Sequence, residues 1–374
     1  MKNKCILLAL CWSFSLGILA QNPADMQAGQ KYADVRDSLK NVDYPYLLPI
    51  WGKKVVQKGF KIPKSAGFSV QYLYQQSDIL ITDLKVGFNN GPQYDLAELV
   101  RFNSAVATSN GVNFRPDFWL FPFLNVYGLF AKSKTSTAID AGLWIPDSSD
   151  TWSKIADINT KKDFDATTYG FGITPTVGVR GYFIILDMNF SWSDISELDQ
   201  PAFVSVFGPR IGKNITWPKH PEKSWAIWVG GFRVKLNSST SGNIKTSDIF
   251  PVNEWGQKIE NGTARVAESQ QKVDTWWDGL TPTEQKNPVN IAKHETADAA
   301  LAKAGNILNA ASQAVTNAAN STIQYSLNKT PKDKWNFLIG TQFQLNRSWM
   351  IRAEYGFLSS RVQLIAGLQY RFDF

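Results

Sequence analysis

The sequence predicts an all-β transmembrane protein, an antiparallel β-barrel of about twelve strands, with ten strands as the alternative. Three observations predict this fold class. Apolar and polar residues alternate in segments of about ten residues, which is the length of a tilted membrane-crossing strand. Aromatic residues make up 13% of the chain. The mean hydropathy of −0.22 is too low for a protein that crosses a membrane with several helices.

The alternation is clearest from Trp335 to Phe374. One face of the last predicted strand is apolar and aromatic, whereas the other is too polar for a dry core and suits a wet lumen. The apolar face holds Leu364, Leu368, Tyr370, Phe372 and Phe374, and the polar face holds Gln363, Gln369, Arg371 and Asp373. Similar segments recur between Phe68 and Leu236, and a weaker candidate at 99–108 makes the even number that single-chain bacterial barrels require.

Residues 1–20 have the features of a secretory signal peptide. Lys2 and Lys4 form a basic start, an uncharged stretch follows, and Ala20 precedes a plausible cleavage point. Both cysteines, Cys5 and Cys11, lie inside this segment, so we expect an exported mature chain without disulfides.

The final strand, which ends at Phe374 with Tyr370 and Phe372 on the same face, resembles that of bacterial outer-membrane β-barrel proteins. This resemblance implies an outer-membrane location and recognition of the last strand by the barrel-assembly machinery. The segments LPIWGKKVVQKGFKIPKSAGFSVQY and FWLFPFLNVYGLFAKSKT resemble a group of uncharacterised exported barrel proteins. That second resemblance implies no activity.

The predicted organisation has four parts after the signal peptide. Residues 21–63 are expected to form a periplasmic segment that docks on the barrel rim or plugs it. Strands 1–9 fall in 64–237, a helical insert in 238–333, and strands 10–12 in 334–374. The turns at 121–122, 180–181 and 346–347 then lie at the same end as the C-terminus, and the connections 134–165 and 238–333 lie outside.

The insert carries a helical pattern of small apolar residues, which predicts an antiparallel helical hairpin. An earlier helix is expected around Val266, Val273 and Trp277, and Thr281-Pro282-Thr283-Glu284 is typical of a helix start. The hairpin could pack on itself, cover the barrel mouth, or serve as a surface interaction element. The apolar positions of the second helix, called the seam here, are Leu301, Ala304, Leu308, Ala311, Val315 and Ala318, with Thr322 and Tyr325 continuing the spacing.

Catalytic and metal chemistry have little support in the sequence. The only histidines, His220 and His294, lie in a predicted periplasmic turn and in the insert, so neither is on a barrel strand where a general base would be needed. Two isolated histidines without cysteine do not make a zinc site. The acidic loop from Asp147 to Asp165 lacks the spacing of a calcium loop. We therefore expect no enzyme, no metal and no cofactor.

Function is expected in the lumen. The predicted inward face balances basic against acidic residues, so it could close a small barrel or line a narrow pore that prefers anions mildly. We expect a channel for small polar or anionic solutes; the alternative is a closed structural or adhesive barrel that displays the insert. The formal net charge of +7 is mild and indicates no nucleic-acid partner. The predicted selectivity residues are Lys85, Arg115, Asp117, Asp187, Arg210, Arg233, Lys235, Arg352, Glu354 and Arg371, with Asp83 and Asp373 beside them.

Overall fold

The computed structural model describes residues 44–374, apart from 59, 61, 148–150, 180, 218, 237–238, 250–251 and 319. The predicted signal peptide, 1–20, and the first part of the predicted N-terminal segment, 21–43, lie outside the described residues.

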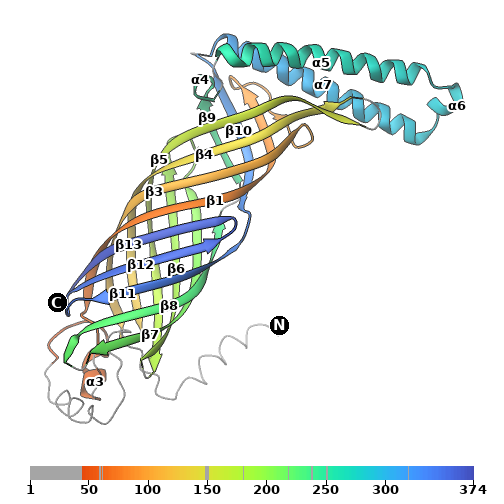
Figure 1. The fold of residues 1–374 in the computed structure, drawn as a ribbon. Coiled ribbons are helices and arrows are strands. Elements are labelled where there is room, and N and C mark those ends of the chain that lie inside the picture. Colours follow the sequence, from red (N-terminus) through yellow and green to blue (C-terminus); the bar gives the residue numbers. More distant parts are fainter. Residues whose placement is uncertain are drawn as a thin grey trace, which may run out of the picture.

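Ten antiparallel strands form a closed barrel (Figure 1). Neighbouring strands pair in the order β1-β3-β4-β5-β6-β7-β8-β11-β12-β13, and β13 pairs back with β1. The ten-strand alternative is therefore confirmed. The strands are β1 (Ala66–Phe88), β3 (Val100–Phe121), β4 (Leu124–Pro146), β5 (Trp152–Val179), β6 (Tyr182–Ile195), β7 (Ala202–Trp217), β8 (His220–Leu236), β11 (Trp335–Gln344), β12 (Trp349–Leu358) and β13 (Arg361–Phe372).

The count of twelve was wrong because two long strands were each read as two. β1 has 23 residues and covers two alternating segments, 68–75 and 84–88, that were counted as separate strands. Its alternation is interrupted at Asp83, which has a φ of 53° and lies in an irregularity of the pairing with β10 (Thr322–Pro331). β3 likewise runs through Asn110-Gly111, a dipeptide typical of hairpin turns. Residues 64–237 therefore hold seven barrel strands and 334–374 hold three.

Four strands continue well beyond the barrel and form an extension. β1, β3, β4 and β5 have 22–28 residues, more than twice the roughly ten that a membrane crossing needs. The prediction of a loop at 134–165 is wrong, because β4 and β5 pair continuously from Leu124 to Pro146. β2 (Tyr94–Asp95), β10 and β9 (Ser239–Lys245) add to the extension on the upper half of β1.

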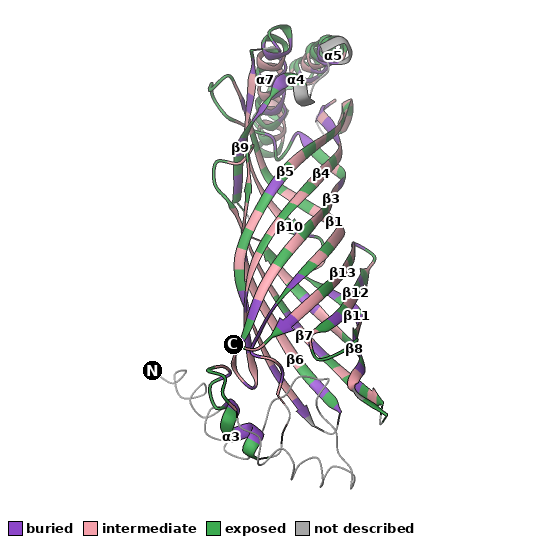
Figure 2. Cartoon of the chain, turned by 90° about the vertical axis from the view of Figure 1, so that its left-hand side faces the viewer, coloured by how far each residue is buried: buried purple, intermediate pink, exposed green. Residues whose placement is uncertain are grey.

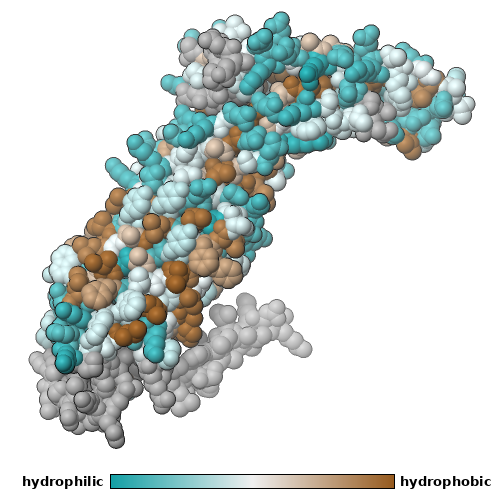
Figure 3. All heavy atoms as spheres, in the orientation of Figure 1, coloured by the Kyte–Doolittle hydropathy of each residue, from teal (hydrophilic) through white to brown (hydrophobic). Residues whose placement is uncertain are grey.

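The outer face of the barrel carries an apolar band. Exposed residues alternate with less exposed ones along parts of most strands (Figure 2). Hydrophobic surface gathers over the lower barrel, whereas the extension and the helices are mainly hydrophilic (Figure 3). Such a band suits contact with lipid. Large exposed apolar side chains come from every barrel strand, among them Phe68, Phe114, Phe130, Phe171, Ile184, Ile211, Val229, Phe337, Ile351 and Leu368.

The connections have the asymmetry expected of an outer-membrane barrel. The short links after β3, β5 and β11 lie at the end of the barrel that holds the C-terminus, as predicted. The insert lies at the opposite end (Figure 1). This arrangement makes the C-terminal end periplasmic. Recognition of β13 by the barrel-assembly machinery stays a prediction.

The insert contains two long helices that lie side by side (Figure 1). They are α5 (Val252–Asp278) and α7 (Pro288–Thr316), with the short helices α4 (Thr246–Ile249) and α6 (Pro282–Gln285). Thr281 caps α6 through a capping box with Glu284, as the sequence indicated, but the long helix begins only after Asn287. In the part of the chain that the structure describes, no helix is long and apolar enough to cross a membrane.

The seam of the hairpin packs on the strand extension. Leu301 and Leu308 share one buried core with Val273 of α5 and with Leu143 and Ile145 of β4. The core also includes Ala304 and Val315, Ala311 packs against it, and Ala318 is buried just beyond the helix end. The helical spacing does not continue further, because Thr322 and Tyr325 belong to β10. The hairpin therefore stands on the extended sheet.

The described part of the N-terminal segment docks on the periplasmic rim. The backbone N–H of Ile50 donates a hydrogen bond to the carbonyl of Leu120, at 2.9 Å. The Trp51 ring lies 4.9 Å from the Phe121 ring, and the short helix α3 (Gly52–Gln57) follows. These contacts attach the segment to the β3–β4 turn.

We predict that Gly340→Ala destabilises the barrel. A Cβ atom at Gly340 would overlap the Trp228 indole, which lies flat against this glycine from the neighbouring strand. Overpacking of this kind costs about 1–3 kcal/mol. The urea midpoint of refolded protein in detergent should therefore fall. Gly256→Ala in α5, where a Cβ meets nothing within 4 Å, is the control and should leave the midpoint unchanged or raise it. An unchanged midpoint for Gly340→Ala would contradict the assignment of close packing.

Candidate functional site

The predicted selectivity residues divide between the lumen and the outside. Seven of them point into the barrel: Arg115, Asp117, Asp187, Arg210, Arg352, Glu354 and Arg371. They form two separate groups, one midway along the lumen and one near the C-terminal end.

The other three predicted residues do not reach the lumen, and their assignment is corrected. Arg233 and Lys235 are exposed, and the residues that alternate with them, Phe232 and Val234, face the interior. Lys85 is exposed on the extension, where its neighbours Leu84 and Val86 pack against the core under the helices. Arg233 and Lys235 were misplaced because the inward face of the upper β8 is apolar, so the charged residues of this segment lie on its outward face.

Three inward aromatic rings lie on glycines of adjacent strands. Tyr127 covers Gly172, Phe183 covers Gly212, and Trp228 covers Gly340, so that a Cβ on any of these glycines would overlap the ring. Each ring and its glycine are direct cross-strand partners. An aromatic residue that covers a cross-strand glycine protects the exposed backbone there. The rings therefore follow the wall and leave the middle of the lumen to charged side chains.

The central charged group joins barrel strands that are not neighbours. Arg210 of β7 binds Glu354 of β12 with two hydrogen bonds, Nε to Oε1 at 2.8 Å and Nη2 to Oε2 at 3.1 Å. The Trp228 indole N–H and Arg352 also donate to Glu354, at 2.9 and 2.6 Å. Because Arg210 and Glu354 are only 7% and 5% exposed, these bonds are made largely out of water. We call Arg210, Glu354, Arg352, Trp228 and Asp187 the central network.

Asp187 of β6 connects the rest of the central network to the adjoining strands β5 and β4. It lies 3.6 Å from the guanidinium of Arg210 and accepts hydrogen bonds from Tyr127 and Thr174, both at 2.9 Å. The Arg115 guanidinium lies 3.4 Å from the centre of the Tyr127 ring, a cation–π contact. Together with Tyr127 and Arg115, the central network therefore connects side chains from β3 to β12.

A second group occupies the periplasmic end. Arg371 donates to Asp117 at 2.9 Å, and both residues are buried. Asn125 and Gln369 also donate to Asp117, at 2.7 and 2.9 Å. Arg371 additionally donates to the backbone carbonyl of Lys64, just before β1. This group ties the last strand to β3 and to the residue just before β1, near the place where the barrel closes.

A cavity of about 350 Å³ occupies the lumen on the outer side of the central network. Its wall mixes apolar and polar residues, with Gln71, Asn113, Asn189 and Gln363 among the polar ones. All of the described lining residues come from barrel strands and none from the helical insert. Beyond the network, towards the periplasm, inward residues such as Thr176, Asn214, Ser224 and Gln344 are buried. The cavity is therefore a vestibule above a filled lower lumen.

Some of the interior was missed from the sequence. Trp228 and Tyr127 were not among the residues predicted to face inward, yet they are 5% and 2% exposed inside the barrel. Arg361 was also not among the residues predicted to face inward, although it is buried, donates to Ser77 and lies over the Phe232 ring. Arg361 lies two residues before Gln363 and therefore points to the same side of the strand, so the alternation alone could have predicted that it faces the lumen.

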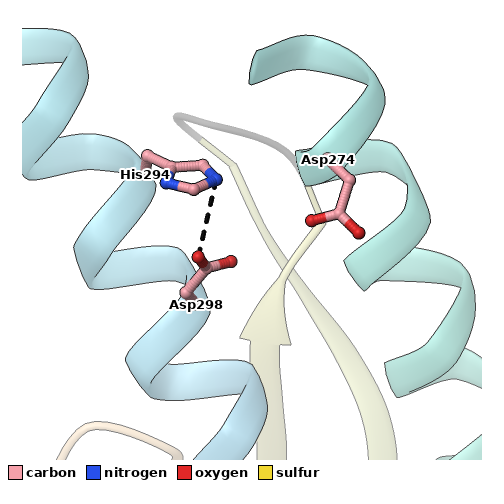
Figure 4. Close-up of side chains that lie close together, drawn as sticks. All are labelled: Asp274, His294 and Asp298. Atoms are coloured by element: carbon pink, nitrogen blue, oxygen red, sulfur yellow. Dashed lines mark ion pairs between the residues drawn. The ribbon is translucent and has the colours of Figure 1, made fainter. Parts of the chain in front are cut away.

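The two histidines lie far from the central network in the fold. His220 is exposed at the start of β8, 3.4 Å from Glu222. His294 of α7, which we expected to be isolated, instead lies among carboxylates. Its Nε2 atom is 3.5 Å from Asp298, and Asp274 of α5 points towards both residues (Figure 4). The sequence argument against a metal site assumed that both histidines are isolated. That assumption is wrong for His294.

The solved structures that resemble this chain share little of its sequence. No protein-family model matches the chain, and no curated protein matches it. The beta domain of the Bordetella autotransporter Brka is 7% identical, with 82% of this chain and 100% of that chain covered and a TM-score of 0.36. The translocator domain of the autotransporter NalP from Neisseria meningitidis is 8% identical, with 82% and 89% covered and a TM-score of 0.29. The toluene transporter TodX from Pseudomonas putida is 8% identical, with 94% and 99% covered and a TM-score of 0.26.

The location follows from the fold and its surface. A closed antiparallel barrel has no unpaired edge, as a strand protein in lipid requires. Its outer face is apolar, and its interior is polar and charged. The protein is a bacterial outer-membrane β-barrel.

We predict that Glu354→Gln destabilises the barrel by about 3 kcal/mol, because it removes the carboxylate that lies nearest to the buried Arg210 and leaves only the more distant Asp187 to balance its charge. The measurement is the free energy of unfolding in urea for protein refolded into lipid vesicles. Glu222→Gln, at the exposed pair with His220, is the matched control and should change it by less than about 1 kcal/mol. Equal effects of the two substitutions would show that the central network does not hold the strands together.

Proposed function

We propose that the protein is an outer-membrane channel for small polar or anionic solutes, closed at rest by the central network. The observation that carries this proposal is the position of the vestibule, which lies in the lumen directly above buried ion pairs. A cavity of about 350 Å³ is in the range of small-molecule sites.

The charge of the vestibule supports a preference for anions. Its lining includes Arg115, Arg210 and Arg352 against Asp187 and Glu354, so one positive charge remains. Arg115 and Arg352 also stack on aromatic rings, at 3.4 and 5.0 Å from the ring centres. Rings of basic side chains favour anions in pores, because they lower the electrostatic barrier to entry.

The central network has the properties of a gate. It is made of side chains alone, so opening requires no change in the hydrogen-bonded wall. Replacing both residues of a buried ion pair lowers the stability of a protein less than replacing one of them, because no unpaired buried charge remains. A solute anion that competes for Arg210 or Arg352 would weaken the bonds to Glu354. The resting state is then closed, and solute binding favours opening.

We predict that the Arg210→Ala, Glu354→Ala double variant conducts more than the wild type. Removing both side chains eliminates the buried ion pair that lies in the lumen below the vestibule. The measurement is single-channel current in planar bilayers, with the reversal potential in a salt gradient. We expect small or rare steps for the wild type and larger, anion-selective steps for the variant.

Selectivity provides the control for the same recording. In the double-variant background, Arg115→Gln should reduce the anion preference, because it removes a vestibule charge. Lys235→Gln removes an equal charge from the outer face and should leave the reversal potential unchanged. Absence of current in every variant would overturn the channel proposal.

A second candidate is a closed barrel that presents the helical hairpin. It is favoured by the filled lower lumen and by a hollow of about 510 Å³ beside the hairpin, lined partly by Pro146, Trp152, Val289 and Ala292. The hollow lies at the end of the β4–β5 pair, far along the extension from the vestibule.

We predict that replacing 252–316 by a short Gly/Ser linker leaves the barrel folded, because none of its ten strands is removed. Heat-dependent migration in electrophoresis measures folding. On the channel proposal, conductance is unchanged, since the vestibule is lined by strands. On the display proposal, attachment of cells that produce the protein to surfaces and to one another is lost. Unchanged attachment would contradict display.

A further inference from the structure

A histidine and two carboxylates meet between the two long helices of the insert. His294 and Asp298 are one turn apart on α7, and Asp274 comes from α5 (Figure 4). The group lies near the end of the hairpin where the helices connect, beside the buried Val273 and Ala297. No barrel residue takes part in it. Its chemistry is therefore separate from that of the lumen.

The spacing of the three possible ligand atoms suits one small ion. The ligand atoms of the three residues all lie within 4.8 Å of one another, and His294 Nε2 lies 3.5 Å from Asp298 Oδ2. Ligand atoms around a tetrahedral zinc ion lie roughly 3.4 Å apart, because the metal–ligand distances are about 2.0–2.2 Å. Asp274 is exposed, so its side chain has room to move closer to the other two ligands.

Neighbouring side chains orient the ligands. The Gln270 amide donates to Oδ1 of Asp274 at 2.9 Å and to Oδ1 of Asp298 at 2.8 Å. It thereby holds the two carboxylates together and leaves Oδ2 of Asp298 facing the imidazole. Trp277 stacks on the His294 ring, with centroids 4.3 Å apart and planes at 21°. Partners of this kind fix ligand geometry in metal sites.

The donor set indicates which ions fit. One imidazole nitrogen with two carboxylate oxygens is a mixed set that zinc and similar first-row transition metals accept. Calcium and magnesium prefer oxygen ligands throughout, and calcium needs six or more. Side-chain exposure of 21% for His294 and 39% for Asp298 leaves room for water to complete the coordination.

We propose that Asp274, His294 and Asp298 bind a divalent transition-metal ion, with zinc as the test ion, and that the ion joins α5 to α7. Because the ligands come from both helices, binding stabilises the hairpin near its tip. Ligand residues on a single helix would not have this effect.

The proposal is tested by zinc titration of the full chain in detergent after treatment with a chelator. Isothermal titration calorimetry should show one site per chain in the wild type. His294→Phe keeps an aromatic ring against Trp277 but removes the ligand nitrogen, so affinity should fall by on the order of tenfold or more. His220→Phe makes the same substitution at the other histidine and should bind zinc as the wild type does.

A second readout reports the position of the ion. Zinc should slow hydrogen exchange in peptides from 266–300 in the wild type and in His220→Phe, but not in His294→Phe. Heat-dependent electrophoretic migration verifies that each variant is folded. Failure of the wild type to bind zinc at micromolar concentrations would overturn the proposal, as would equal binding by wild type and His294→Phe. Neither outcome affects the channel proposal, which involves none of these residues.

Discussion

The pairing of β1 with β13 is the constraint on which the rest of the structure depends. Lipid offers no hydrogen-bonding partners, so every backbone group of a membrane sheet must find one within the protein. Residues Ala66–Ser77 of β1 meet this need by pairing with β13, from Phe372 to Arg361. From Ile79 onward, β1 pairs with β10 instead. One strand therefore both closes the barrel in the membrane and begins the extension above it.

Closure at ten strands determines what the interior can be. Eight strands leave a lumen that side chains can fill, and much larger barrels leave a channel. A barrel of ten strands has a lumen only slightly wider than one that side chains fill completely. Here aromatic rings lie against wall glycines, and Arg210 and Glu354 meet across the middle. The outcome is a filled lower half and an outer vestibule of about 350 Å³.

The extension gives the insert a place outside the membrane. The four long strands carry an apolar surface beyond the barrel, and this surface needs cover. The hairpin supplies it, because the seam around Leu301 and Leu308 packs against Leu143 and Ile145. The helix pair therefore rests on the sheet, while its outer side and its tip, where His294 meets two carboxylates, remain available to solvent and ligands.

The sequence by itself determined the fold class, the outer-membrane location, the positions of the short turns and the presence of a helical hairpin. These features depend on local alternation and spacing, which each segment carries alone. The strand count depended on whether Asp83 and Asn110-Gly111 end a strand or lie within one, and pairing with distant strands decides that. The outward placement of Arg233 and Lys235 likewise follows from β8 packing its apolar face into the lumen. The meeting of Arg210 with Glu354, and of His294 with Asp274, joins residues that only the closed barrel and the folded hairpin bring together.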